Sequence, residues 1–165
     1  MDDPGGVIVV GVDGSPGAAA ALDFALAEGR ARGCRVQVVT AWLGSVPLGQ
    51  APDSADQVEA RARVEQMQSD VVARRKAELG EVPDPDCVVV QDYAGRVLVA
   101  RSEQASMVVV GSGTPGSASQ QVLGSVAEYC VRHARVPVVI VPAPSRLERR
   151  ATLAAVTPGS ASDPD

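Results

Sequence analysis

The chain of 165 residues has very few aromatic side chains: one phenylalanine, one tryptophan and two tyrosines. Proteins that bind single-stranded nucleic acid stack its bases on exposed aromatic rings, so this composition argues against such a function. The net charge of −5 also opposes binding to a phosphate backbone. We therefore expect no nucleic-acid partner.

Histidine and lysine are equally scarce, and each scarcity excludes a kind of site. His133 is the only histidine, which rules out zinc sites built on several histidines. Lys76 is the only lysine, and no G-x-x-x-x-G-K-[ST] motif can be formed, so a Walker-type nucleotide site is excluded. The only candidate for a catalytic base is Asp13. We assign no catalytic residue and no metal site.

The three cysteines, Cys34, Cys87 and Cys130, are far apart and form no C-x-x-C pair. We expect all three to be small buried residues in a reducing compartment. The acidic start of the chain does not resemble a signal peptide, and no apolar run approaches the roughly 20 residues needed to cross a bilayer. These observations favour a cytoplasmic location without membrane attachment.

Five short valine-rich runs alternate with helical patterns along the chain. Their apolar residues are continuous rather than alternating, which is typical of parallel strands covered on both faces. Strands joined by helices form right-handed βαβ units. We therefore expect an α/β, Rossmann-like fold with a single open parallel five-stranded sheet, in the order 3-2-1-4-5, and helices on both faces. The expected strands are Val7–Val12, Val36–Trp42, Cys87–Gln91, Met107–Val110 and Val138–Val141.

Helix boundaries follow from capping signals and apolar stripes. Ser15 can cap a first helix that begins at Pro16. Val64, Met67 and Val71 form the apolar stripe of the second. The later expected helices are Gln57–Leu79, Ala94–Gln104 and Leu123–His133. We expect residues 1–5 to be a flexible N-terminus, residues 6–142 to form one domain, and residues 143–165 to be a disordered tail.

Two glycine-rich turns follow the first and fourth expected strands: Asp13-Gly14-Ser15-Pro16-Gly17 and Ser112-Gly113-Thr114-Pro115-Gly116. In the order 3-2-1-4-5 both turns face the crevice at the carboxyl ends of strands 1 and 4, where open parallel sheets bind ligands. Backbone N–H groups of such turns and of helix starts can hold phosphate. Asp13 can accept hydrogen bonds from a ribose, hold a metal ion, or only cap its own turn.

Two related ligand-binding classes fit less well. Residues 111–116 satisfy G-x-G-x-x-G, but a dinucleotide fold places this motif after its first strand and an acid after the next. Here the motif follows the fourth strand, and the fifth ends in Ile140-Val141-Pro142. A phospho-receiver domain needs an acidic pair after strand 1 and a lysine after strand 5, and the chain has neither.

The sequence resembles the universal stress protein family over roughly residues 6–142. The resemblance rests on the stretches 9–15 and 36–42, and most of all on residues 108–111, 124–126 and 135–142. Nucleotide-binding members carry a glycine, two residues, a glycine, nine residues, and then glycine with Ser or Thr. Gly111 fills the first of these positions and Gly124-Ser125 the last, while Thr114 stands at the second glycine.

The resemblance implies a cytoplasmic stress-response regulator that binds ATP or AMP, with or without Mg²⁺. Asp13 would contact the ribose, Val12 and Ala41 the adenine, and the loop after Gly111 the phosphates. The nucleotide-binding residues implied in this way are Val12, Asp13, Ala41, Gly111, Ser112, Gly113, Thr114, Gly124, Ser125 and Val126.

Two other functions remain open. Thr114 and the lack of any Lys or Arg in residues 112–126 favour a dimeric protein-interaction module with weak or no nucleotide binding. Slow ATP hydrolysis is the third function, with Asp13 as its only base. The fifth strand would be an exposed apolar edge, so we expect a homodimer unless the tail folds back over it. We also expect an unidentified regulatory protein partner. The dimer residues would be Val136, Val138, Val139, Ile140 and Val141.

Overall fold

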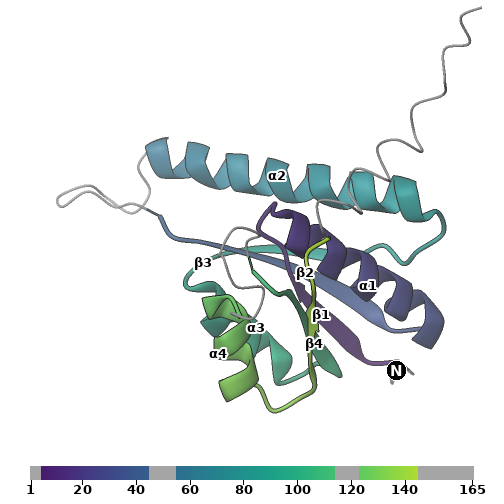
Figure 1. Cartoon of the computed structure of the whole chain (residues 1–165). Coiled ribbons are helices and arrows are strands. Elements are labelled where there is room, and N and C mark those ends of the chain that lie inside the picture. The colour runs from purple at the N-terminus through teal and green to yellow at the C-terminus, as the bar shows by residue number, and fades with distance from the viewer. Residues whose placement is uncertain (1–4, 45–54, 114–122, 145–165) are drawn as a thin grey trace, which may run out of the picture.

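A computed structural model of the chain describes residues 5–44, 55–113 and 123–144. Strands and helices alternate through these residues (Figure 1). The elements are β1 (Val7–Gly11), α1 (Pro16–Arg32), β2 (Arg35–Trp42), α2 (Ala55–Leu79), β3 (Asp86–Gln91), α3 (Ala94–Ser102), β4 (Met107–Gly111), α4 (Ser125–His133) and β5 (Val138–Val141).

The five strands form one parallel sheet in the order β3-β2-β1-β4-β5, which confirms the predicted α/β fold and strand order. Central strand β1 pairs with β2 on one side and β4 on the other, so that Val10 lies level with Val38 and Val109. Because β1 and β4 are parallel neighbours in the sheet, their carboxyl ends lie side by side, where open sheets of this kind bind ligands.

Each face of the sheet packs against its own helices and its own apolar cluster. Ile8 and Val10 of β1 belong to the cluster that contains Leu22 and Leu26 of α1. Val9, between them, belongs to the cluster with Leu98 on the opposite face. Successive strand residues point to opposite faces, so a strand covered on both sides needs apolar residues at every position. This explains the continuous valine runs.

Helix α1 begins and ends as predicted from its sequence. The Ser15 hydroxyl accepts a hydrogen bond from the Ala18 N–H at 3.2 Å, and Pro16 is the first helical residue. Gly33 ends the helix with a φ of +66°, a conformation that glycine adopts without a steric penalty.

Helix α2 differs from its prediction at its first turn and on its buried face. It begins at Ala55, and its predicted stripe of Val64, Met67 and Val71 is only half-buried. Gln57, Gln68 and Val72 are its buried residues. Figure 1 shows α2 lying along one side of the sheet, beside α1. A helix that contacts the sheet along one side buries few residues. In α2 the buried residues Gln68 and Val72 each follow directly after a residue of the predicted stripe, Met67 and Val71.

The cysteine prediction is right for two residues and wrong for the third. Cys34 and Cys130 are buried, and burial raises the pKa of the Cys130 thiol to about 11. Cys87 is exposed because it lies near the start of β3, an edge strand of the sheet. Partial desolvation of its sulfur, and then the nearby Asp86 carboxylate, raise the pKa of this thiol.

Helices α3 and α4 are both slightly shorter than predicted. Helix α3 ends at Ser102, two residues before its predicted end, and α4 starts at Ser125 because Gly124 is its N-cap. None of the helices in the described residues has the length and apolar character that a membrane crossing requires. The predicted flexible N-terminus and tail lie largely outside the described residues.

Candidate functional site

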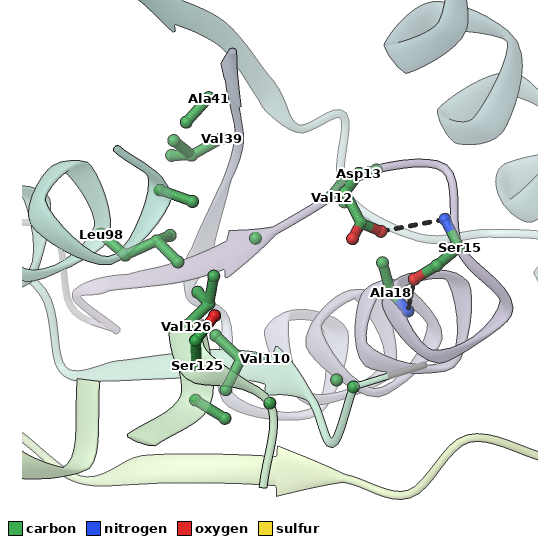
Figure 2. A pocket seen from close by; sticks show the side chains of 16 residues that line it. Val12, Asp13, Ser15, Ala18, Val39, Ala41, Leu98, Val110, Ser125 and Val126 are labelled. Atoms are coloured by element: carbon green, nitrogen blue, oxygen red, sulfur yellow. Dashed lines mark hydrogen bonds between the residues drawn. The ribbon is translucent and has the colours of Figure 1, made fainter. Parts of the chain in front are cut away.

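A pocket of about 320 Å³ lies where β1 and β4 end side by side (Figure 2). Its walls come from the β1–α1 turn, the C-terminal half of β2, the starts of α3 and α4, and the end of β4. The lining residues are Gly11, Val12, Asp13, Ser15, Ala18, Val39, Ala41, Ala94, Leu98, Val110, Gly111, Gly113, Gly124, Ser125, Val126 and Ala127.

The pocket brings together most of the residues predicted to bind a ligand. Ser112 is not among its lining residues, and Thr114 lies outside the described residues. The predicted residues that line the pocket are Val12, Asp13, Ala41, Gly111, Gly113, Gly124, Ser125 and Val126.

Asp13 caps its own turn with one of its two carboxylate oxygens. Its Oδ1 accepts a hydrogen bond from the Ser15 N–H at 2.9 Å (Figure 2). Oδ2 has no hydrogen bond within the part of the chain that the structure describes. The side chain is exposed at the pocket. The capping role is therefore present, and the second oxygen stays available to a ligand hydroxyl.

The glycines on the β4 side are required by close backbone packing. A Cβ on Gly111 would lie 2.7 Å from the carbonyl carbon of Gly17 in α1. Gly113 has a φ of +113°, and a Cβ there would lie 3.1 Å from the Cα of Gly124. The Gly124 N–H donates to the Ser112 carbonyl oxygen at 2.9 Å. These contacts bring the end of β4 against the starts of α1 and α4.

The starts of α1 and α4 differ in how their N–H groups are satisfied. The Ser15 side chain caps α1, whereas Gly124 gives α4 no side-chain cap. Ser125, Val126 and Ala127, the first residues of α4, line the pocket. Free N–H groups and the positive end of the helix dipole favour an anion at such a start.

The opposite side of the pocket is apolar. Val39, Ala41 and Leu98 form this wall, and Figure 2 shows them together across the pocket from Asp13. The backbone of Val12 is already engaged: its N–H donates to the Val39 carbonyl at 2.9 Å, and its carbonyl accepts from the Thr40 hydroxyl at 2.8 Å. Val12 therefore meets a ligand through its side chain or the second lone pair of its carbonyl.

Charge at the pocket is limited to one carboxylate. Asp13 is the sole charged residue among the described residues that line it. By sequence, residues 114–122 contain no Lys or Arg either. No group of three His, Cys, Asp or Glu residues lies close enough to hold a metal ion in residues 5–44, 55–113 and 123–144. This arrangement suits binding of a polar ligand and lacks an acid–base pair.

Several lining residues were not predicted. Gly11 and Val110 adjoin predicted residues in sequence, and the sequence pattern indicates only a capping role for Ser15. Ala94 and Leu98 belong to α3, which carries no glycine motif that would have marked it. Only the sheet order shows that the start of α3 reaches the same edge. The unpredicted lining residues are Gly11, Ser15, Ala18, Val39, Ala94, Leu98, Val110 and Ala127.

An open parallel sheet with a crevice at the carboxyl ends of β1 and β4 defines a class of α/β proteins that bind ligands at this edge. The chain belongs to the universal stress protein family, whose model matches residues 6–142. A universal stress protein of Mycobacterium tuberculosis is 36% identical over 135 residues. That match covers 81% of this chain but 44% of the relative. The chain therefore spans about half the length of the curated relatives it matches.

Solved structures of the family are similar to most of this chain. A universal stress protein family member from Burkholderia pseudomallei is 32% identical, with a TM-score of 0.58, and the match covers 87% of this chain and 100% of that chain. The universal stress protein of Archaeoglobus fulgidus in complex with dAMP is 25% identical, with a TM-score of 0.58. The latter match covers 81% of this chain and 95% of that chain.

Proposed function

We propose that the protein binds an adenine nucleotide, AMP or ATP, in the pocket between β1 and β4 and acts as a cytoplasmic regulator of a stress response. One observation carries the binding proposal. A single pocket of about 320 Å³ combines an apolar wall, a carboxylate oxygen without a partner in the described residues, and a helix start without a side-chain cap. These features match the base, the ribose and the phosphate of a nucleotide.

Each part of the ligand has a place in this proposal. The base packs against Val39, Ala41 and Leu98, the ribose hydroxyls donate to Oδ2 of Asp13, and the phosphate accepts from N–H groups at the start of α4. The dAMP complex of the related Archaeoglobus fulgidus protein supports an adenine nucleotide as the ligand class. The family membership supports the stress-response role.

The charge of the pocket favours AMP over free ATP. No cation among the described lining residues offsets a triphosphate, and the Asp13 carboxylate repels one. Mg²⁺ bound to ATP usually keeps several waters and takes one or two carboxylates together with the phosphates. Asp13 can supply one such carboxylate, so ATP binding should depend on Mg²⁺ while AMP binding does not.

Titration calorimetry with AMP tests the proposal through two lining residues. We expect wild type to bind, and Asp13→Ala and Ser125→Ala each to weaken binding by about tenfold, which corresponds to about 1.4 kcal/mol. Each change removes a side chain that can hydrogen-bond the ligand, and a hydrogen bond to a charged group contributes about 1.5–3 kcal/mol.

Asp92→Ala is the matched control for Asp13→Ala. Asp92 also follows a strand and also caps a backbone N–H, that of Tyr93 at 2.7 Å, but it does not line the pocket. Its removal should leave AMP affinity unchanged. If wild type binds AMP and neither pocket variant weakens binding, the nucleotide site lies elsewhere on the molecule.

A second function, that of a dimeric protein-interaction module, is favoured by the absence of cations from the described pocket lining. Strand β5 forms an edge of the sheet, and all four of its residues are only half-buried. We propose a homodimer through this edge, with an unidentified regulatory protein as a further partner. A wild-type chain that dimerises but binds neither AMP nor Mg²⁺–ATP would favour this second function over the first.

A further inference from the structure

Two buried polar side chains meet behind the pocket, where α2 crosses β2. Thr40 of β2 is 2% exposed and Gln68 of α2 is 3% exposed. Burying a hydroxyl and an amide is costly unless both are hydrogen-bonded. Neither residue lines the pocket, and neither was singled out by its sequence pattern.

These side chains form a directed series of hydrogen bonds that ends at the pocket. Nε2 of Gln68 lies 3.0 Å from Oγ1 of Thr40, and the Thr40 hydroxyl donates to the Val12 carbonyl at 2.8 Å. The same Nε2 lies 3.1 Å from the Val88 carbonyl and 3.3 Å from that of Val38. An amide has two N–H groups, so Gln68 donates to two of these three acceptors at a time.

The acceptor at the end of this series belongs to a residue of the candidate site. Val12 lines the pocket, and the peptide that joins it to Asp13 has its carbonyl oxygen held by Thr40. The Val12 N–H is held by the Val39 carbonyl at 2.9 Å. With both groups fixed, the direction in which the Asp13 carboxylate leaves the backbone is also constrained.

Helix α2 contacts the same turn at a second, adjacent residue. A Cβ on Gly14 would lie 3.2 Å from the sulfur of Met67, the neighbour of Gln68. Gly14 has a φ of +81°, so the turn after Asp13 relies on glycine both for its backbone conformation and for the space beside α2. Met67 and Gln68, two consecutive residues of α2, therefore both constrain the segment from Val12 to Gly14.

We propose that Thr40 and Gln68 are positioning residues of the nucleotide site, which fix the Val12–Asp13 peptide and thereby the ribose-binding carboxylate. This inference rests on the proposed function. Without the Thr40 hydroxyl, the Val12 carbonyl loses its buried donor and the peptide can rotate. Asp13 then spends less time in the orientation that a ribose requires, and nucleotide affinity falls.

Calorimetry with AMP on four single variants and one double variant, with thermal melts of each, separates positioning from general stability. Thr40→Val keeps the shape and removes the hydroxyl, Thr40→Ser keeps the hydroxyl, and Gln68→Leu removes the amide. Val72→Ala is the control, because Val72 is the buried apolar residue one helical turn beyond Gln68, packs in the core, and has no polar side-chain atom that could join the series of hydrogen bonds. The ¹³C chemical shift of the Val12 carbonyl reports the hydrogen bond directly.

We expect Thr40→Val and Gln68→Leu each to weaken AMP binding by about fivefold, the factor that one ordinary hydrogen bond contributes. Their double variant should be weakened no more than Thr40→Val alone, because both act through one acceptor. Thr40→Ser should bind as wild type does. Val72→Ala should lower the melting temperature without changing AMP affinity or the Val12 shift.

The outcomes distinguish this inference from the function on which it rests. A wild type that binds neither AMP nor Mg²⁺–ATP overturns both. A wild type that binds, with Thr40→Val and Gln68→Leu unchanged in affinity, overturns the positioning role alone. Weakening of the same size in Val72→Ala also overturns it, because loosening α2 would then be sufficient. If Thr40→Val does not fold, Gln68→Leu and Thr40→Ser decide.

Discussion

Beside the pocket, the backbone at Gly111, at the end of β4, packs against Gly17 in the first turn of α1. A Cβ on Gly111 would lie 2.7 Å from the carbonyl carbon of Gly17 and 3.1 Å from the Ala18 nitrogen. Both are backbone atoms of a helix start, which cannot rotate away as a side chain can. The first glycine of the family pattern therefore has a structural reason that is independent of any ligand.

This contact predicts opposite effects for alanine at its two sides. Gly111→Ala should lower the free energy of unfolding by about 1–3 kcal/mol, the usual cost of overpacking. Gly17→Ala places its Cβ at 3.4–3.9 Å from its neighbours, an ordinary contact, and replaces glycine within a helix. It should be neutral or stabilising by up to about 1 kcal/mol. Urea unfolding of both variants measures the difference, and equal destabilisation would contradict the packing argument.

Single residues of the site could be predicted only where a local pattern marks them. Asp13, Gly111 and Gly124 stand at fixed places in strand–turn–helix segments, so the sequence alone singles them out. Thr40 and Gln68 have no such mark, because their importance comes from a contact between β2 and α2, 28 positions apart. A contact between residues so far apart in the chain leaves no local pattern in the sequence.

Among the helices, α2 has the fewest buried apolar residues, and polar contacts also attach it to its neighbours. Besides Gln68, Arg75 binds Asp23 of α1 through two parallel hydrogen bonds of 2.5 Å, from Nε and from an Nη nitrogen. The side chains are 22% and 29% exposed, and Arg75 also pairs with Glu78. These partners, Asp23 first, raise the pKa of Arg75, so the guanidinium stays charged.

Removing this link should loosen α2 without unfolding the sheet. We expect Arg75→Met to lower the free energy of unfolding by about 1–2 kcal/mol, between the values for exposed and buried pairs. Amide hydrogen exchange in the second half of α2 should rise. Arg61→Met, which removes an exposed i,i+4 pair with Glu65 in the same helix, is the control and should change stability by at most about 0.5 kcal/mol. Equal effects of the two variants would mean that the Arg75–Asp23 link does not hold α2.

The bounds and buried faces of helices and strands were predicted best for elements that are covered on both faces. All five strands were predicted to within one residue at each end, and the signal is clearest in β1 and β4, which are covered on both faces and apolar throughout. The buried face of α2 was predicted only in part. Val71 of the apolar stripe packs against the core, but the fully buried residues are Gln57, Gln68 and Val72. A helix also attached through Gln68 and Arg75 need not bury its most apolar stripe completely.

For the whole molecule, the sheet has two edges with different surroundings. At one edge, α2 lies beside β3, and residues of both line a groove. The other edge is β5, whose four apolar residues are all half-buried. The curated relatives are about twice as long as the segment that they share with this chain. We expect β5 to carry a contact with a second copy of this chain.

The dimer prediction follows from the composition and position of β5. The apolar residues of this strand leave part of their surface uncovered at a sheet edge, which is a site of association unless it is blocked. A two-fold axis would place the same patch of both copies in contact. Sedimentation velocity should show wild type as a dimer, and Val139→Arg as a folded monomer, because a charge on this half-buried residue opposes burial of the strand between two copies. Val58→Arg introduces the same charge at an exposed valine of α2 and should remain dimeric. Circular dichroism confirms that each variant is folded. A monomeric wild type would contradict the prediction, and so would a folded Val139→Arg variant that stays fully dimeric.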